Sequence, residues 1–465
     1  MQSRTITALA AAVVLTAGAC SSSATTAPAG GSSAPAASTG AGSSTAVGGK
    51  SVTIGVDLPL SGGEFANGDP TKKGIELAVN QANQKGGVAG YKIVLSIKDD
   101  AVNGVHNPQQ GATNIQGFVA DPTVIGVVGP FNSNVGAAEI PVSNRAGLLQ
   151  CGPANTNPGL TKPQYGALSI RSAYPNRINY IRVATTDDIQ GLAGAEFAYN
   201  DLGKRRAYVV DDTETYGKGL ADVFVTQFKA LGGTVIKQDG APSSTTDYTP
   251  LLTAVQGQNP DVVYFGGVTA TGGGLLRKQM AQVGMGNIAF GGGDGIVDGP
   301  GNVQGSFIKV AGSAAANSFG TVAATHDIPN ASAFSDAYKA AYGAAPGAYS
   351  ASAYACTQVI LQSLQAVAGS ASGSGLREAV RAYATDSSHS FTTQLGTISF
   401  DQNGDTTQHI ISFYKTDMSA AGGVGDWVFV RQQDFGGAGS SGASAAPGAS
   451  SAPAASAAAS PAASQ

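Results

Sequence analysis

The segment Val124-Ile125-Gly126-Val127-Val128-Gly129-Pro130-Phe131-Asn132-Ser133 is the most informative part of this chain about its fold. Its first six residues are continuously apolar, a pattern typical of a strand buried on both faces of a parallel sheet. Gly129 and Pro130 end the strand, and a helix is predicted from Val135 to Arg145. A buried strand, a short loop and a helix together predict an α/β fold with parallel strands.

The same unit recurs on both sides of this segment. Residues 52–58 alternate between apolar and polar side chains, which predicts a strand with one buried face, and Ile75 and Val79 belong to a helix after it. The pattern restarts after Tyr180. Further strands are predicted at 91–97, 148–151, 207–210, 261–265 and 288–290, and further helices at 107–118, 220–231 and 274–283. The sequence therefore predicts two Rossmann-like lobes that bind ligands beyond the carboxyl ends of their strands.

The amino terminus predicts export. Residues 1–19 carry one positive charge at Arg4, then an apolar run, then small residues, as a secretory signal peptide does. The segment Ala17-Gly18-Ala19-Cys20 resembles a bacterial lipobox, which implies that Cys20 is lipidated and becomes the new amino terminus. An ordinary signal peptide that happens to contain a cysteine is the alternative.

Both ends of the mature chain have a composition that does not support a core. Residues 20–49 and 434–465 consist mostly of Ser, Ala, Thr, Gly and Pro, which bury too little apolar surface to offset chain entropy. We expect the first to be a disordered tether and the second a disordered tail. The folded part is then about residues 50 to 433.

Composition also narrows the possible partners. A net charge of −4 with 12% charged residues provides no basic stripe, so we expect no nucleic acid partner. If Cys20 carries lipid, only Cys151 and Cys356 remain of the three cysteines. They are either two small buried apolar residues, which we favour, or one disulfide formed in an oxidising compartment.

The sequence has no recognisable catalytic or metal-binding motif. The four histidines are scattered at positions 106, 326, 389 and 409 without ligand-like spacing, and no G-x-S-x-G segment occurs. Asp401, Asn403 and Asp405 resemble the start of a calcium loop, but Gly404 stands at the wrong position, so a β-turn is predicted there. We therefore expect no enzyme activity, no cofactor and no metal.

Several short segments, taken in order, resemble one known family. They are Leu60-Ser61-Gly62, Gly86-Gly87-Val88-Ala89-Gly90, Asp99-Asp100, Gly129 to Ser133, Pro153 to Pro158, Tyr216-Gly217-Lys218-Gly219 and Phe290 to Asp294. Over residues 50 to 433 the chain resembles the type I periplasmic binding proteins of ABC importers, in the leucine/isoleucine/valine-binding branch.

The resemblance implies how the lobes are divided. The amino-terminal lobe would comprise residues 50–185 and 322–397, and the carboxyl-terminal lobe residues 186–321 and 398–433. Three hinge crossings near 184–187, 313–326 and 395–400 would join them.

The resemblance also implies a binding site. Ser133, the backbone N–H of Ala154 and Thr156 would hold the α-carboxylate of the ligand, and Ser133 stands at a predicted helix start, where free N–H groups favour an anion. Asp294 would contact the ligand ammonium, although branched-chain members have the longer Glu there. Tyr216 would cover the ligand and hydrogen-bond it. Helix capping by the hydroxyl residues, a turn role for Asp294 and packing of Tyr216 are the alternatives.

Residues that would line the side-chain pocket depart from the family. Asn67 stands where branched-chain members have an aromatic residue, and Val268 stands where they have a tyrosine. Tyr349 matches an aromatic lining position, with core packing as the alternative. The family's usual disulfide positions correspond to Val102 and Asn132, so that bridge is absent. These changes put leucine itself in doubt as the ligand.

The resulting functional prediction is a lipid-anchored solute-binding protein on the outer side of a bacterial cell membrane. It would capture a small zwitterion, an amino acid, and present it to an ABC permease. An extracellular sensor of the same fold is an alternative, and so is a ligand that is an amide, a short peptide or a simple carboxylate.

Overall fold

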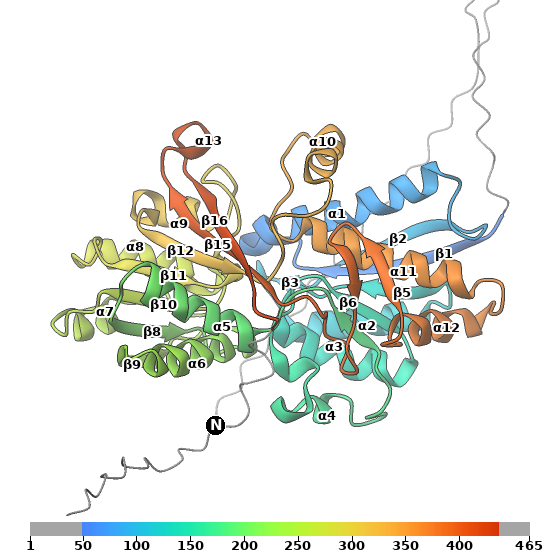
Figure 1. Ribbon diagram of the computed structural model, residues 1–465, viewed down its shortest axis with the longest axis horizontal. Coiled ribbons are helices and arrows are strands. Elements are labelled where there is room, and N and C mark those ends of the chain that lie inside the picture. Colours follow the sequence, from blue (N-terminus) through green and yellow to red (C-terminus); the bar gives the residue numbers. More distant parts are fainter. Residues whose placement is uncertain (1–48, 437–465) are drawn as a thin grey trace, which may run out of the picture. The chain divides into compact units, whose positions relative to one another are not determined.

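Two sheets organise the chain in this computed structural model, which describes residues 49–436 (Figure 1). The first has five parallel strands in the order β2-β1-β5-β6-β7, and the second has seven in the order β16-β15-β12-β11-β10-β8-β9. We call each sheet with its helices lobe I and lobe II. Lobe I contains β1 (Ser51–Leu58), β2 (Lys92–Asp99), β5 (Val124–Val128), β6 (Leu149–Gly152) and β7 (Tyr180–Arg182). Lobe II contains β8 (Arg206–Asp211), β9 (Thr234–Gly240), β10 (Val262–Gly266), β11 (Ala289–Gly292), β12 (Ser318–Val322), β15 (Ile410–Asp417) and β16 (Asp426–Asp434).

The α/β prediction is confirmed, with two differences. Strands β15 and β16 pair antiparallel at one edge of the second sheet, whereas only parallel strands were predicted. Strand β1 is buried on both faces rather than one, because it lies between β2 and β5 with helices on each side. A side chain at Gly55 of β1 would meet Phe118 of helix α2 (Pro108–Ala120), while one at Gly126 of β5 would meet Ile360 of helix α11 (Ser350–Val367).

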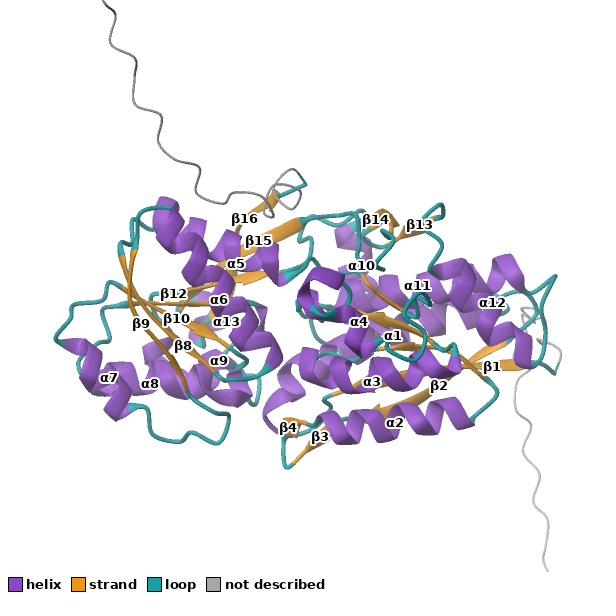
Figure 2. Ribbon diagram, turned by 90° about the horizontal axis from the view of Figure 1, so that it is seen from below, coloured by secondary structure: helices purple, strands orange, loops and turns teal. Residues whose placement is uncertain are grey.

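Helices cover both sheets (Figure 2). Those beside the first sheet are α1 (Phe65–Gln84), α2 (Pro108–Ala120), α3 (Ser133–Ala146), α4 (Ala167–Ile170), α10 (Ala331–Tyr342), α11 (Ser350–Val367) and α12 (Ser374–Ala384). Those beside the second are α5 (Asp187–Glu196), α6 (Thr215–Ala230), α7 (Thr249–Gln256), α8 (Gly274–Gln282), α9 (Phe307–Ala311) and α13 (Ala420–Gly423). Two small hairpins, β3 (Ala101–Val102) with β4 (Val105–His106) and β13 (Ser390–Thr393) with β14 (Gly396–Ser399), complete lobe I.

The chain passes between the lobes three times, after β7, after β12 and after β14. Strand pairing differs from the expected lobe limits at four residues. Val322 pairs with Ser412 and Asp434 pairs with Ile410, so both belong to the second sheet. Ile398 and Ser399 pair with β13 and belong to lobe I. Phe435 is buried as well. Movement of the lobes about these crossings stays a prediction.

Cys151 and Cys356 form a disulfide that joins β6 to α11 across a sequence separation of 205 residues. The prediction that favoured two unpaired buried cysteines was therefore wrong. Local sequence does not show that α11, which follows all of the parallel strands of lobe II, returns to the first sheet. The predicted β-turn is present, because the Gly404 N–H donates to the Asp401 carbonyl at 3.0 Å. Asp401 Oδ1 supports the turn by accepting from the N–H groups of Asn403 and Asp405 at 2.8 and 2.9 Å.

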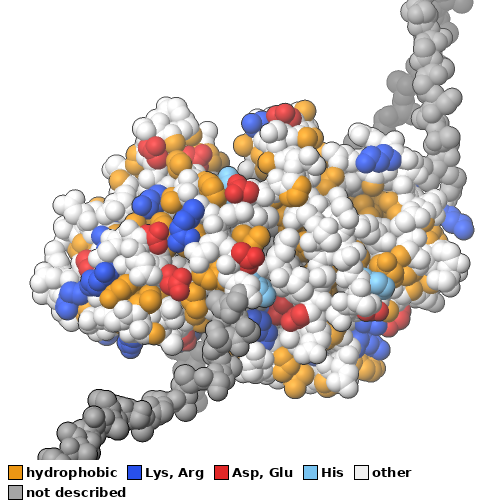
Figure 3. All heavy atoms as spheres, in the orientation of Figure 1, with side chains coloured by type: hydrophobic (Ala, Val, Ile, Leu, Met, Phe, Trp, Pro, Cys, Tyr) orange, Lys and Arg blue, Asp and Glu red, His pale blue; other side chains and the backbone are white. Residues whose placement is uncertain are grey.

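The signal peptide, Cys20, the tether and most of the tail lie outside the described residues. Within residues 49–436, no helix combines the length and apolar character needed to cross a membrane. Lysine and arginine side chains are interspersed with acidic ones on the face shown in Figure 3.

Candidate functional site

A small cavity lies between the carboxyl ends of strands from the two lobes. It is lined by Phe131, Asn132, Ser133, Ala154, Thr156, Tyr216, Val268 and Asp294. Its empty space, counted to the open mouth, is about 210 Å³. This space includes open solvent, so the enclosed part of the cavity is smaller.

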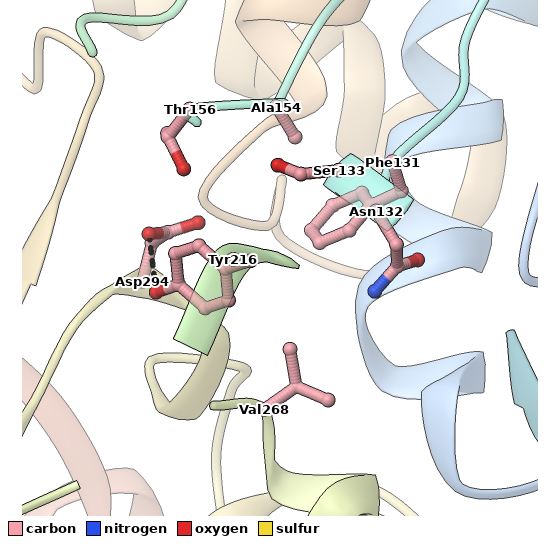
Figure 4. A pocket seen from close by; sticks show the side chains of 8 residues that line it. All are labelled: Phe131, Asn132, Ser133, Ala154, Thr156, Tyr216, Val268 and Asp294. Atoms are coloured by element: carbon pink, nitrogen blue, oxygen red, sulfur yellow. Dashed lines mark hydrogen bonds between the residues drawn. The ribbon is translucent and has the colours of Figure 1, made fainter. Parts of the chain in front are cut away.

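Lobe I contributes polar groups without charge to the cavity. Ser133 is the first residue of α3 and is 2% exposed, and Thr156 in the loop after β6 is 1% exposed. Their hydroxyl groups point toward the space in front of Tyr216 and Asp294 (Figure 4). Because the first N–H groups of a helix have no partner within the helix, this side of the cavity can bind an anion.

The loop after β6 is held by buried hydrogen bonds. Asn155 Nδ2 donates to the Phe131 carbonyl at 2.8 Å, and the Tyr180 hydroxyl donates to Asn155 Oδ1 at 2.6 Å. Arg182 Nη1 donates to the Asn157 carbonyl at 2.8 Å, while its Nε lies 2.6 Å from Asp405 Oδ1. These bonds fix the backbone that places Thr156 in the cavity.

Lobe II contributes a buried carboxyl group, Asp294, directly after β11. Its Oδ1 accepts hydrogen bonds from the Tyr216 hydroxyl at 2.8 Å and from Gln190 Nε2 at 2.7 Å. Burial raises the pKa of Asp294, and the bonds from Gln190 and Tyr216 partly offset that rise. Burial and the charge of Asp294 together raise the pKa of Tyr216 well above its usual value.

A second buried acid, Asp187, lies near the cavity at the start of α5. Neither of its carboxyl oxygens has a hydrogen-bond donor among the described residues. Burial, followed by the negative charge of Asp294, raises the pKa of Asp187 well above its usual value. A cation placed against Asp294 would relieve this repulsion, so the lobe II side of the cavity favours a positive group.

Six of the eight residues predicted from the sequence line the cavity: Ser133, Ala154, Thr156, Tyr216, Val268 and Asp294. Asn67 and Tyr349 are not among its lining residues. Asn67 is buried in the first turn of α1. Tyr349 is 2% exposed, packs its ring edge-on against Phe131 with 5.5 Å between ring centroids, and through its hydroxyl partly offsets the rise that burial causes in the pKa of Asp294. Its role in ligand binding stays a prediction.

Sequence reasoning missed Phe131, Asn132 and Gln190. The first two precede Ser133 in the same loop, so their adjacency to a predicted site residue was an available signal. Gln190 lies 104 residues before the Asp294 that it contacts, and no local pattern connects them.

A family model described as periplasmic binding protein matches residues 51–423. This chain belongs to the periplasmic binding protein family. Members of this family are solute-binding proteins of ABC transporters rather than enzymes, and they work outside the cytoplasmic membrane. The family prediction from the short sequence segments is confirmed.

Individual relatives refine the comparison. The Leu/Ile/Val-binding protein BraC3 of Rhizobium johnstonii is 33% identical over 365 residues, covering 78% of this chain and 91% of its own. The crystal structure of the leucine binding protein LivK from Thermotoga maritima has a TM-score of 0.67 and 26% identity, covering 82% of this chain and 99% of its own.

A more distant solved structure has the same fold. The solute binding protein of an ABC transporter from Rhodopseudomonas palustris, in complex with 3,4-dihydroxybenzoic acid, has a TM-score of 0.65 and 20% identity. It covers 83% of this chain and 97% of its own. Relatives of this fold therefore include both amino-acid and aromatic-acid binders by name.

Proposed function

We propose that this protein captures a small amino acid between its lobes and delivers it to the permease of an ABC importer. One observation carries the proposal: an uncharged cradle on lobe I, containing Ser133 and Thr156, faces the buried carboxyl of Asp294 on lobe II. A zwitterion has a carboxylate that the cradle on lobe I can bind and an ammonium that Asp294 can bind. Its binding would join the lobes, so it would favour the closed arrangement.

Two further facts support an amino acid. Relatives at 31–33% identity are named Leu/Ile/Val-binding proteins. Phe131 and Val268 give the cavity an apolar wall on which a short aliphatic side chain can pack. The shorter Asp294 and the valine at 268 favour a ligand that differs in size from leucine.

Cys20 indicates where the protein would act. A lipid on this residue would hold the protein at the membrane, close to a permease. Replacing Cys20 by alanine is expected to move the protein from the membrane fraction to the medium or periplasm. Unchanged membrane association of that variant would contradict lipidation.

A thermal-shift panel tests the ligand class. It compares L-alanine, L-valine, L-leucine, their amides, and the aromatic acid 3,4-dihydroxybenzoate. A ligand at 100 times its Kd stabilises the folded form by about 2.7 kcal/mol. With an unfolding entropy of roughly 2.1 cal/mol/K per residue over residues 49–436, the midpoint should rise by about 3–4 °C.

Asp294→Asn is the matched variant. Asparagine keeps one oxygen to accept the bonds from Gln190 and Tyr216, while the charge is removed. We expect it to weaken amino-acid binding by roughly 10- to 100-fold, because hydrogen bonds to charged groups contribute about 1.5–3 kcal/mol. Stabilisation by 3,4-dihydroxybenzoate alone, with no effect of any amino acid, would refute the amino-acid assignment.

A further inference from the structure

His106 connects the two lobes through both nitrogens of its ring. The residue ends β4, in a hairpin at the end of lobe I that faces lobe II (Figure 2). Its Nδ1 is hydrogen-bonded to Glu64 Oε1 in the same lobe, and its Nε2 lies 2.6 Å from Glu214 Oε2 of lobe II. The His106 side chain is 2% exposed. The ring is therefore enclosed between carboxylates of two different lobes.

Glu214 is fixed at the start of α6, two residues before Tyr216. Its backbone N–H donates to Asp212 Oδ1 at 3.0 Å. The same Oε2 atom that contacts His106 also accepts a bond from Asn134 Nδ2 at 2.9 Å, on α3 of lobe I. One carboxylate oxygen of lobe II thus takes two hydrogen bonds from lobe I, beside the proposed ligand site.

Only the protonated imidazole ring can donate to both glutamates, because the neutral ring has a single N–H. Burial by itself lowers the pKa of His106, but Glu64 and Glu214 outweigh this effect and place the pKa well above 6.5. The other ionisable groups that face this cluster are all acidic: Asp100 and Asp212 toward His106, and Asp298 toward Glu64.

We propose that Glu64, His106 and Glu214 form a charged latch that stabilises the closed arrangement of the lobes, and that deprotonation of His106 weakens closure and ligand capture. The part about ligand capture rests on the proposed function. His106 and Glu214 are positioning residues, because neither lines the cavity.

The direction of the pH effect follows from the geometry. Opening would remove Glu214 from His106, while Glu64 would stay, so the closed form binds the proton more tightly than the open form. The latch is complete at pH values below the open-form pKa of His106. It is lost as the pH rises through the closed-form pKa, which lies well above 6.5.

Lobe closure without ligand tests the proposal directly. Donor and acceptor dyes are attached to unnatural residues introduced at the exposed positions Gln116 on α2 and Lys229 on α6. Single-molecule energy transfer then gives the ratio of closed to open molecules at pH 6 and pH 9. We expect that ratio to fall at pH 9 in the unaltered chain.

Glu214→Gln and His106→Gln should each reduce the closed-to-open ratio at pH 6 by about tenfold, the equivalent of about 1.4 kcal/mol. The double variant should lose little more than either single one, because both remove the same interaction. The pH dependence that remains in His106→Gln belongs to other groups, such as Asp212, whose pKa burial raises to about 7. Glu378→Gln on α12, where the glutamate side chain is half-exposed, is the control and should leave the closed-to-open ratio unchanged.

A wild-type ratio that is equal at pH 6 and pH 9 would overturn the proposal. So would a Glu214→Gln ratio equal to that of the Glu378→Gln control, provided that both variants keep wild-type circular dichroism. The same samples are titrated with L-alanine, L-valine and L-leucine, and the apparent Kd of any of these that binds should rise in Glu214→Gln, by up to about tenfold. Absence of binding by all three amino acids would count against the proposed ligand class, and the ligand-free measurement would still decide on the latch.

Discussion

The disulfide between Cys151 and Cys356 gives a sharp stability prediction. It closes a loop with a sequence separation of 205 residues, for which the chain-entropy model gives a stabilisation of roughly 5 kcal/mol. If lobe II stays folded while lobe I unfolds, only segments 152–182 and 323–355 are loose. The loop is then roughly 60 residues and the stabilisation about 4 kcal/mol.

Loss of the disulfide should therefore lower the thermal midpoint of unfolding by a large amount. For a unit of 150–250 residues, 1 kcal/mol corresponds to about 2–4 °C, so 4 kcal/mol predicts a loss of about 10 °C or slightly more. The assay is scanning calorimetry with and without a phosphine reductant, in a chain where Cys20 is replaced by alanine. The variant in which alanine replaces both Cys151 and Cys356 is the control, and its thermal midpoint should be the same with and without the reductant.

Two outcomes would refute this reasoning. One is an oxidised protein whose midpoint equals that of the double-alanine variant within about 1 °C, although the entropy model predicts several kcal/mol. The other is a thiol titration of the unfolded, unreduced protein that finds two free thiols.

Two further predictions concern buried charges in lobe I. Burial raises the pKa of Asp57 from 3.8 to about 6. The folded protein therefore loses stability as the pH rises from about 4 through 6, because Asp57 ionises less readily in the folded than in the unfolded chain. Asp57→Asn should therefore raise the free energy of unfolding at pH 8 by up to about 3 kcal/mol, and by little at pH 4, as measured by urea titration. Arg182→Met leaves the carboxyl of Asp405 buried without its partner, which should cost about 3–5 kcal/mol in the same assay. Arg182 also donates to the Asn157 carbonyl in the loop after β6, so Arg182→Met should weaken ligand binding as well. An unchanged ligand affinity would show that this loop does not need the arginine.

Much of the site could be predicted from single segments of sequence. The apolar run before Gly129 predicts a buried strand, the residues after Ser133 predict a helix, and the junction between them lies at the carboxyl edge of a parallel sheet. Asp294 follows its strand in the same way. Such positions are determined locally, because strand period, helix period and loop glycines all act over a few residues.

The remaining features depend on contacts between distant residues. Tyr349 directly precedes α11, and only the packing of lobe I turns its ring onto Phe131 and leaves it outside the cavity lining. The pairing of Cys151 with Cys356 and of His106 with Glu214 joins residues 205 and 108 positions apart. By itself the sequence determined the α/β units and the chemical character of their ends, through local periodicity. Which ends meet across the cleft was decided only by the tertiary structure, because the chain crosses between the two sheets three times.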